Sequence, residues 1–97
     1  MITKQAQNMS KENSLTDKQN QAYIDIVGAK YAKADEAEES YQGEYESDED
    51  FARNMAEELG SIDKNAVWPY IRIDWEYAAK ELMYDYSENS GFYFRDL

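Results

Sequence analysis

The chain has 97 residues and a net charge of −11, from 21 acidic against 10 basic residues, and it contains neither cysteine nor histidine. This length suits one small domain or two joined subdomains, and the acidity excludes ordinary binding to nucleic acids or anionic membranes, which needs a positive field. The missing side chains exclude disulfides, thiolate metal sites and the commonest general base. Because 42% of the residues are hydrophobic and 14% aromatic, we expect a folded protein with a basic partner.

The amino-terminal residues 1–16 are rich in Lys, Gln, Asn and Ser and show no sustained period. Such a segment does not offset the entropy cost of ordering it, so we predict a flexible tail outside the fold. It also lacks the apolar run of a signal peptide, and no apolar run in the chain is long enough to cross a membrane. We therefore expect a cytoplasmic protein.

Two helices are predicted in the first half of the folded part. The first runs from Asp17 to about Gly28, because its apolar residues recur at three- and four-residue steps: Ala22, Tyr23, Ile26 and Val27. The second spans residues 35–41, with Asp35 as the amino-terminal cap and Gly43 just beyond the other end.

A third helix is predicted from Ser47, a good N-cap, to the stop signal Gly60. Three acids follow the cap in the first turn, where the helix dipole favours negative charge. Its apolar face consists of Phe51, Ala52, Met55, Ala56 and Leu59.

The carboxy-terminal part combines an extended segment, a helix and a strand. The segment Val67–Ile73 holds the only proline and is rich in aromatic and β-branched residues, so it should run extended. Asp74 then caps a fourth helix, whose apolar positions are Trp75, Ala78, Ala79, Leu82 and Tyr86. After a polar turn at 87–91, residues 92–95 suit a strand that we expect to pair with Val67–Ile73.

These elements predict a mainly α fold with a small β element, an α+β protein of about four short helices and a carboxy-terminal aromatic strand pair. We expect three parts along the chain: the tail 1–16, an acidic helical subdomain 17–60 and an α+β subdomain 61–97.

Most of the negative charge lies between Asp35 and Glu58, where Arg53 is the single base and the segment carries −10. Its acids are Asp35, Glu36, Glu38, Glu39, Glu44, Glu46, Asp48, Glu49, Asp50, Glu57 and Glu58. Carboxylates three or four residues apart on a helix stand roughly 5–6 Å apart, comparable with neighbouring phosphates of a duplex. The segment is therefore a candidate partner-binding surface that imitates DNA, with a solvated helix face as the plainer interpretation.

Several strings in this region resemble ArdA-type antirestriction proteins, which mimic DNA. They are the stretches 38–45, 47–52, 55–60, 68–69 and 73–82, read as EESYQGEY, SDEDFA, MAEELG, WP and IDWEYAAKEL. The resemblance covers about Gln21 to Arg95 and leaves out the family's amino-terminal domain. It also departs at Lys80 and Glu81, where the family has Arg-Asp, so a bidentate pairing there is not assumed.

The resemblance implies a cytoplasmic inhibitor of type I restriction–modification enzymes that occupies their DNA-binding cleft without binding nucleic acid itself. The family dimerises through its carboxy-terminal part, which makes Trp75, Tyr77, Leu82, Phe92 and Phe94 candidates for a self-interface, with core packing as the alternative. The same mimicry could be aimed at a CRISPR effector or a transcription factor, or the chain could be an acidic adaptor that does not imitate DNA. Tyr41 and Tyr45 are secondary contact candidates, with half-buried packing as the alternative.

An enzyme is the least favoured class. Adjacent acids such as Glu57 and Glu58, or Asp48 and Asp50, are the only catalytic material, and exposed pairs lack the pocket that separates pKa values. The run from Asp35 lacks the spacing of an EF-hand calcium loop. We expect no catalytic residues, no cofactor and no metal site.

Overall fold

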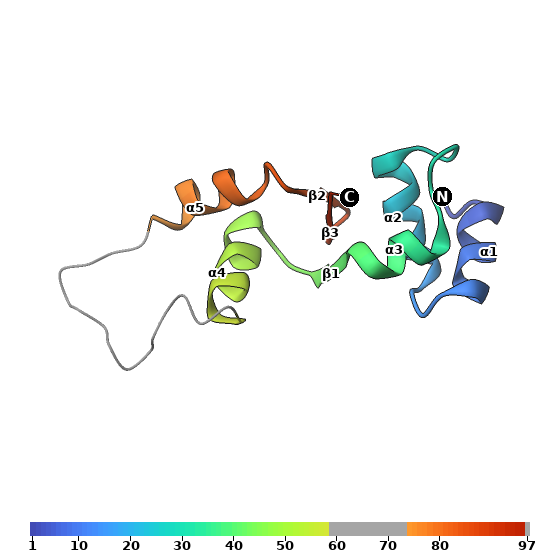
Figure 1. The fold of residues 1–97 in the computed structure, drawn as a ribbon, viewed down its shortest axis with the longest axis horizontal. Coiled ribbons are helices and arrows are strands. Elements are labelled where there is room, and N and C mark those ends of the chain that lie inside the picture. Colours follow the sequence, from blue (N-terminus) through green and yellow to red (C-terminus); the bar gives the residue numbers. More distant parts are fainter. Residues whose placement is uncertain (59–73, 97) are drawn as a thin grey trace. The chain divides into compact units, whose positions relative to one another are not determined.

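The structure is a computed structural model that describes residues 1–58 and 74–96 (Figure 1). The chain forms two compact units: the first unit is Met1–Glu44 with Asp85–Leu97, and the second unit is Tyr45–Tyr84. Across the described residues there are five helices and one three-stranded antiparallel sheet. The predicted α+β class with carboxy-terminal strands is thus confirmed.

The first unit begins with helix α1 (Lys4–Glu12), so the prediction of a flexible tail over residues 1–16 is wrong. Thr3 caps this helix by accepting a hydrogen bond from the Ala6 N–H at 3.2 Å. Ala6 and Met9 are 0% and 4% exposed, and Leu15 is 8% exposed. The sequence does not predict this helix, because Ala6 and Met9 are too few apolar residues to show a helical period. The helix is stabilised by packing against its neighbours.

Helix α2 (Asp17–Val27) follows the prediction closely. Thr16 and Gln19 form a capping box at its start, and Gly28 ends it with φ +91°, a conformation that favours glycine. Ala22 and Tyr23 are buried as expected, together with Asn20. Ile26 and Val27, at the far end of the same face, are half-buried.

Helix α3 (Ala34–Ser40) occupies the place of the second predicted helix, but its cap differs. The N-cap position is Lys33, without a side-chain capping bond, while Asp35 lies in the first turn and interacts with the helix dipole. Ala37 and Ser40 are 0% exposed and turn toward the core. The chain then enters strand β1 (Tyr41–Glu44) directly.

The sheet has the strand order β1-β3-β2, with β2 at Tyr86–Asn89 and β3 at Phe92–Arg95. The strand predicted at 92–95 is confirmed, but its predicted pairing with Val67–Ile73 is wrong because β3 is central and both of its edges are occupied. Val67–Ile73 itself lies outside the described residues. The polar turn predicted at 87–91 consists of only two residues, Ser90 and Gly91. Both have positive φ, as a two-residue hairpin turn requires.

Aromatic rings from three elements meet in the core of the first unit. The Phe94 ring centroid lies 5.2 Å from that of Tyr23 on α2 and 5.3 Å from that of Tyr41 on β1. Asn20 is also fully buried in this unit, and its Nδ2 donates to Ser10 Oγ at 3.0 Å and to Asn13 Oδ1 at 3.2 Å. This polar network links α2 to α1 and to the turn that follows α1.

The second unit contains helices α4 (Asp48–Glu58) and α5 (Trp75–Leu82), which pack on one another. Both predicted caps are confirmed: the Asp50 N–H donates to Ser47 Oγ at 3.1 Å, and the Tyr77 N–H donates to Asp74 Oδ1 at 3.0 Å. Phe51 and Ala52 of the predicted apolar face are buried at 1% and 5% exposure. The stop signal Gly60 lies outside the described residues.

The division into units differs from the predicted boundaries at 17–60 and 61–97. Strand β1 pairs with β3 from the other end of the chain, so the hairpin 86–95 joins the first unit and α4 joins α5 in the second. Tyr86, predicted on the last helix, belongs to β2, because α5 ends at Leu82. No helix in the described part of the chain is long and apolar enough to cross a membrane.

Candidate functional site

The eleven acids between Asp35 and Glu58 divide between the two units. The first acidic surface comprises Asp35, Glu36, Glu38, Glu39 and Glu44, and the second comprises Glu46, Asp48, Glu49, Asp50, Glu57 and Glu58. Nine of the eleven are exposed, and the remaining two, Glu36 and Asp50, are half-buried. No acid of the segment is used in a core, so nearly all of this charge faces water.

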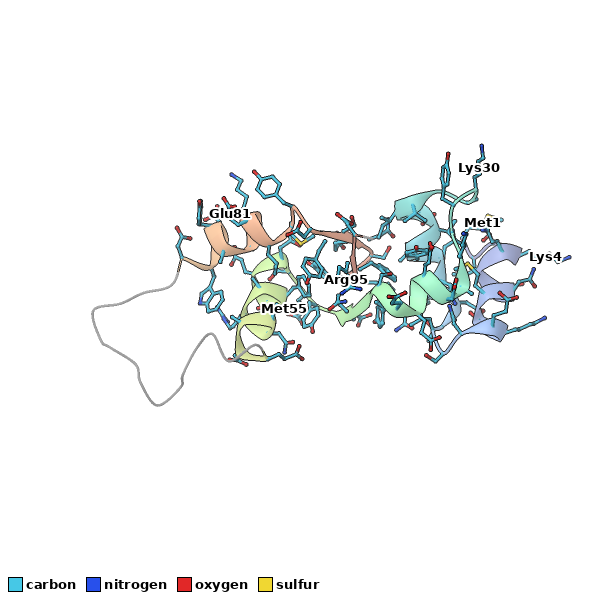
Figure 2. All side chains as sticks on the ribbon, in the orientation of Figure 1. Met1, Lys4, Lys30, Met55, Glu81 and Arg95 are labelled. Carbon is cyan, nitrogen blue, oxygen red and sulfur yellow. The ribbon has the colours of Figure 1, made fainter. Side chains whose placement is uncertain are left out.

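The first acidic surface is built on α3, whose opposite side carries the buried Ala37 and Ser40. Glu38 accepts hydrogen bonds from the Ser14 hydroxyl and from the Ser14 N–H, the latter at 3.3 Å. Glu39 Oε1 lies 4.0 Å from Arg95 Nη2 of β3, which extends toward α3 (Figure 2). These contacts hold two of the carboxylates in place while leaving them at the surface.

The first acidic surface affects the pKa of Tyr23 on α2. Burial raises the pKa of the Tyr23 hydroxyl most, and the charges of Glu36 and Asp35 raise it further. Both effects disfavour the tyrosinate anion. The negative potential of α3 therefore reaches the phenol of α2.

The second acidic surface has acids at both ends of α4. Asp48, Glu49 and Asp50 occupy the first turn, where the helix dipole favours them, whereas Glu57 and Glu58 occupy the last turn, which holds no base. The helix dipole does not favour an acid in this last described turn. Burial raises the pKa of the Tyr45 hydroxyl, and the charge of Glu58 raises it further.

The single base of the segment, Arg53, lies against an aromatic ring. Its guanidinium carbon is 5.3 Å from the centroid of the Trp75 ring on α5. A groove of about 330 Å³ in the same unit is lined by Asp48 and Glu49 of α4 and by Glu76 and the base Lys80 of α5. Sequence reasoning did not include Glu76 in the acidic segment, since only the packing of α5 on α4 brings it there.

The two tyrosines considered as partner contacts serve in packing. The Tyr41 ring packs on Phe94 at 5.3 Å, and its hydroxyl accepts a hydrogen bond from Gln19 Nε2 at 3.0 Å. The Tyr45 ring lies 5.2 Å from Phe51. Both side chains are half-buried, in line with the alternative interpretation.

The candidates for a self-interface separate into buried and accessible residues. Phe92 and Phe94 are 8% and 1% exposed within the first unit, so for them the structure supports core packing instead. In the second unit Tyr77 is 62% exposed, and Trp75 and Leu82 are half-buried.

Metal-binding geometry is absent from the described ranges 1–58 and 74–96, where no three acids are grouped so that they could hold an ion. The pairs weighed as catalytic material lie on α4, with Asp48, Glu57 and Glu58 exposed and Asp50 half-buried. Comparison with protein-family models, curated proteins and solved structures finds no match for this chain.

Proposed function

We propose that the chain is a DNA-mimicking antirestriction protein of the ArdA kind. It occupies the DNA-binding cleft of a type I restriction–modification enzyme in the host cytoplasm and inhibits that enzyme stoichiometrically, without catalysis and without a cofactor. The observation that carries the proposal is the exposure of the acids in the segment 35–58, which number eleven against one base and none of which is buried.

The spacing within each unit supports this function. On α3, Asp35, Glu38 and Glu39 follow the three- and four-residue steps that put side chains on one helix face, roughly 5–6 Å apart. A cleft lined with Lys and Arg attracts such a row as it attracts phosphates, and the attraction raises the association rate. Because the row carries no bases, the enzyme has nothing to read or modify.

The position of Glu58 in the last described turn of α4 supports the proposal through the energetics of the helix. An acid in the last helical turn costs about 0.3–1 kcal/mol through the dipole. Residues that oppose a local rule are expected where function requires them. A binding role for Glu58 accounts for an acid at a position where folding favours a base.

The proposed function is tested by the inhibition of a purified type I restriction–modification enzyme. DNA cleavage and DNA methylation are measured while the chain is titrated, and both should fall to zero at a fixed molar ratio. Full activity in excess chain contradicts the restriction target. Inhibition of a CRISPR effector or of a transcription factor in the same titration would then identify a different DNA-binding target.

A matched pair of variants separates a shaped acidic surface from net charge. Glu44→Gln, Glu46→Gln and Glu49→Gln together remove three exposed acids of the two surfaces for which no side-chain hydrogen bond or ion pair is described. The net charge changes from −11 to −8. The control replaces three exposed acids elsewhere, Glu12, Asp17 and Asp85, by the corresponding amides and gives the same net charge.

The first variant should inhibit between about threefold and a hundredfold more weakly, because exposed charges contribute about 0.2–1 kcal/mol each. The control should inhibit as the unmodified chain does. Equal weakening of the two variants would mean that only net charge matters and that the two acidic surfaces are wrongly assigned.

A further inference from the structure

The first unit contains a cavity of about 410 Å³ between α2 and the β2–β3 hairpin. Its apolar wall is formed by Tyr23, Ile26, Val27 and Phe94. The volume falls within the range of about 300–1,000 Å³ that small-molecule sites occupy. Tyr23 and Phe94 are buried core rings, so this wall is fixed by the packing of the unit.

The charged groups on the rim of the cavity are two acids and one base. Glu36 of α3 and Asp96 lie on it, with Arg95 as the one base. The Arg95 guanidinium is directed to Glu39, at 4.0 Å, and the Ser87 hydroxyl donates to Asp96 Oδ1 at 2.6 Å. The rim therefore presents two carboxylates beside an apolar wall, of which Asp96 is held by Ser87. Glu36 belongs both to the cavity and to the first acidic surface.

We propose that this cavity receives an apolar side chain that the target protein carries next to a lysine or arginine. Charge complementarity selects the occupant: the rim attracts a cation, while the wall of Ile26, Val27 and the two rings removes an apolar group from water. The identity of the partner as a protein with a basic cleft rests on the function proposed above. The cavity supplies what an acidic row lacks, a contact that depends on shape and persists when salt screens the charges.

Three tripeptide probes test the cavity directly on the full chain. Acetyl-Lys-Phe-Lys-amide carries both features, acetyl-Lys-Ala-Lys-amide lacks the apolar group, and acetyl-Glu-Phe-Glu-amide reverses the charge. Binding is followed by NMR through the methyl signals of Ile26 and Val27. The first probe should shift these signals and bind at least about tenfold more tightly than the alanine probe, as burial of a Phe side chain implies. The glutamate probe should not saturate them.

Two single variants provide the matched control. Glu36→Gln and Glu44→Gln each remove one acid of the first acidic surface, but only Glu36 lines this cavity. Glu36→Gln should weaken the Lys-Phe-Lys probe by between about 1.5-fold and fivefold, and Glu44→Gln should leave its affinity unchanged.

Equal affinity for the Phe and Ala probes, shifts that miss Ile26 and Val27, or equal weakening by both variants would overturn the cavity proposal. Its failure is distinct from failure of the proposed function. A chain that inhibits the restriction enzyme but ignores the Phe probe keeps the acidic surfaces and loses the cavity. A chain that binds the probe at Ile26 and Val27 without inhibiting any DNA-binding enzyme keeps the cavity and loses DNA mimicry.

Discussion

Single residues show how the acidic surfaces and the core of the first unit affect one another. Tyr23 is 4% exposed, and the pKa of its hydroxyl is raised by burial, then by Glu36 and Asp35. A raised folded-state pKa means that the neutral phenol is favoured in the folded chain. The stability it contributes is fully present below the ordinary tyrosine pKa of about 10 and is lost as the pH rises through the folded-state value.

We predict that the free energy of unfolding falls when the pH is raised above about 10. Tyr23→Phe should reduce this fall, because it removes a buried group that must ionise. The measurement is urea unfolding at a series of alkaline pH values. A second observable is the pKa of the Tyr23 hydroxyl, read from the Tyr23 ring signal in NMR. Glu36→Gln should lower this pKa, and Glu44→Gln should leave it unchanged. An unchanged alkaline slope in Tyr23→Phe would contradict the assignment.

At the scale of elements, the sequence predicts those whose signal is local. Helix α2 shows its apolar steps, and α4 and α5 show the caps Ser47 and Asp74 together with an apolar face. Strand β1 has no such signal, since Tyr41–Glu44 contains a glycine and becomes a strand only through β3, from the far end of the chain. The strand β3 itself was predictable from its aromatic run, but its partners were not.

Helix α1 was also missed, and its role in the core can be tested with two substitutions. Met9→Ala should lower the free energy of unfolding by about 2–5 kcal/mol, because Met9 is 4% exposed and truncation leaves a cavity. Gln7→Ala, on the exposed side of the same helix, should cause no loss. Thermal unfolding followed by circular dichroism measures both. If both substitutions proved neutral, residues 1–16 would be the tail that their composition suggests.

Helix α4 allows a test of whether Glu58 serves binding although it lowers the stability of the helix. Glu58→Gln should stabilise the second unit by about 0.3–1 kcal/mol, since it removes an acid that opposes the dipole in the last turn. Glu76→Gln, in the first turn of α5, should destabilise the unit by a similar amount. Tryptophan fluorescence during urea unfolding follows this unit through Trp75 of α5. A destabilised Glu58→Gln variant would show that Glu58 serves the fold.

At the scale of the whole molecule, the charge is shared between the units. The first unit has eleven acids against six bases and the second has ten against four, so they carry −5 and −6. The acidic segment 35–58 was predictable as a charge run, and its exposure follows from the core-facing sides of α3 and α4. Its division between two units was not predictable, because it depends on the long-range pairing of β1 with β3.

The central claim is that this charge takes the place of DNA, and competition for one enzyme tests it most directly. A type I restriction–modification enzyme is loaded with a labelled duplex that contains its recognition site, and the chain is added at low and at moderate salt. We predict that the chain displaces the duplex, that excess unlabelled duplex displaces the chain, and that both interactions weaken as the salt concentration rises. A ternary complex that holds the enzyme, the duplex and the chain together would contradict DNA mimicry and would mark the chain as an acidic adaptor.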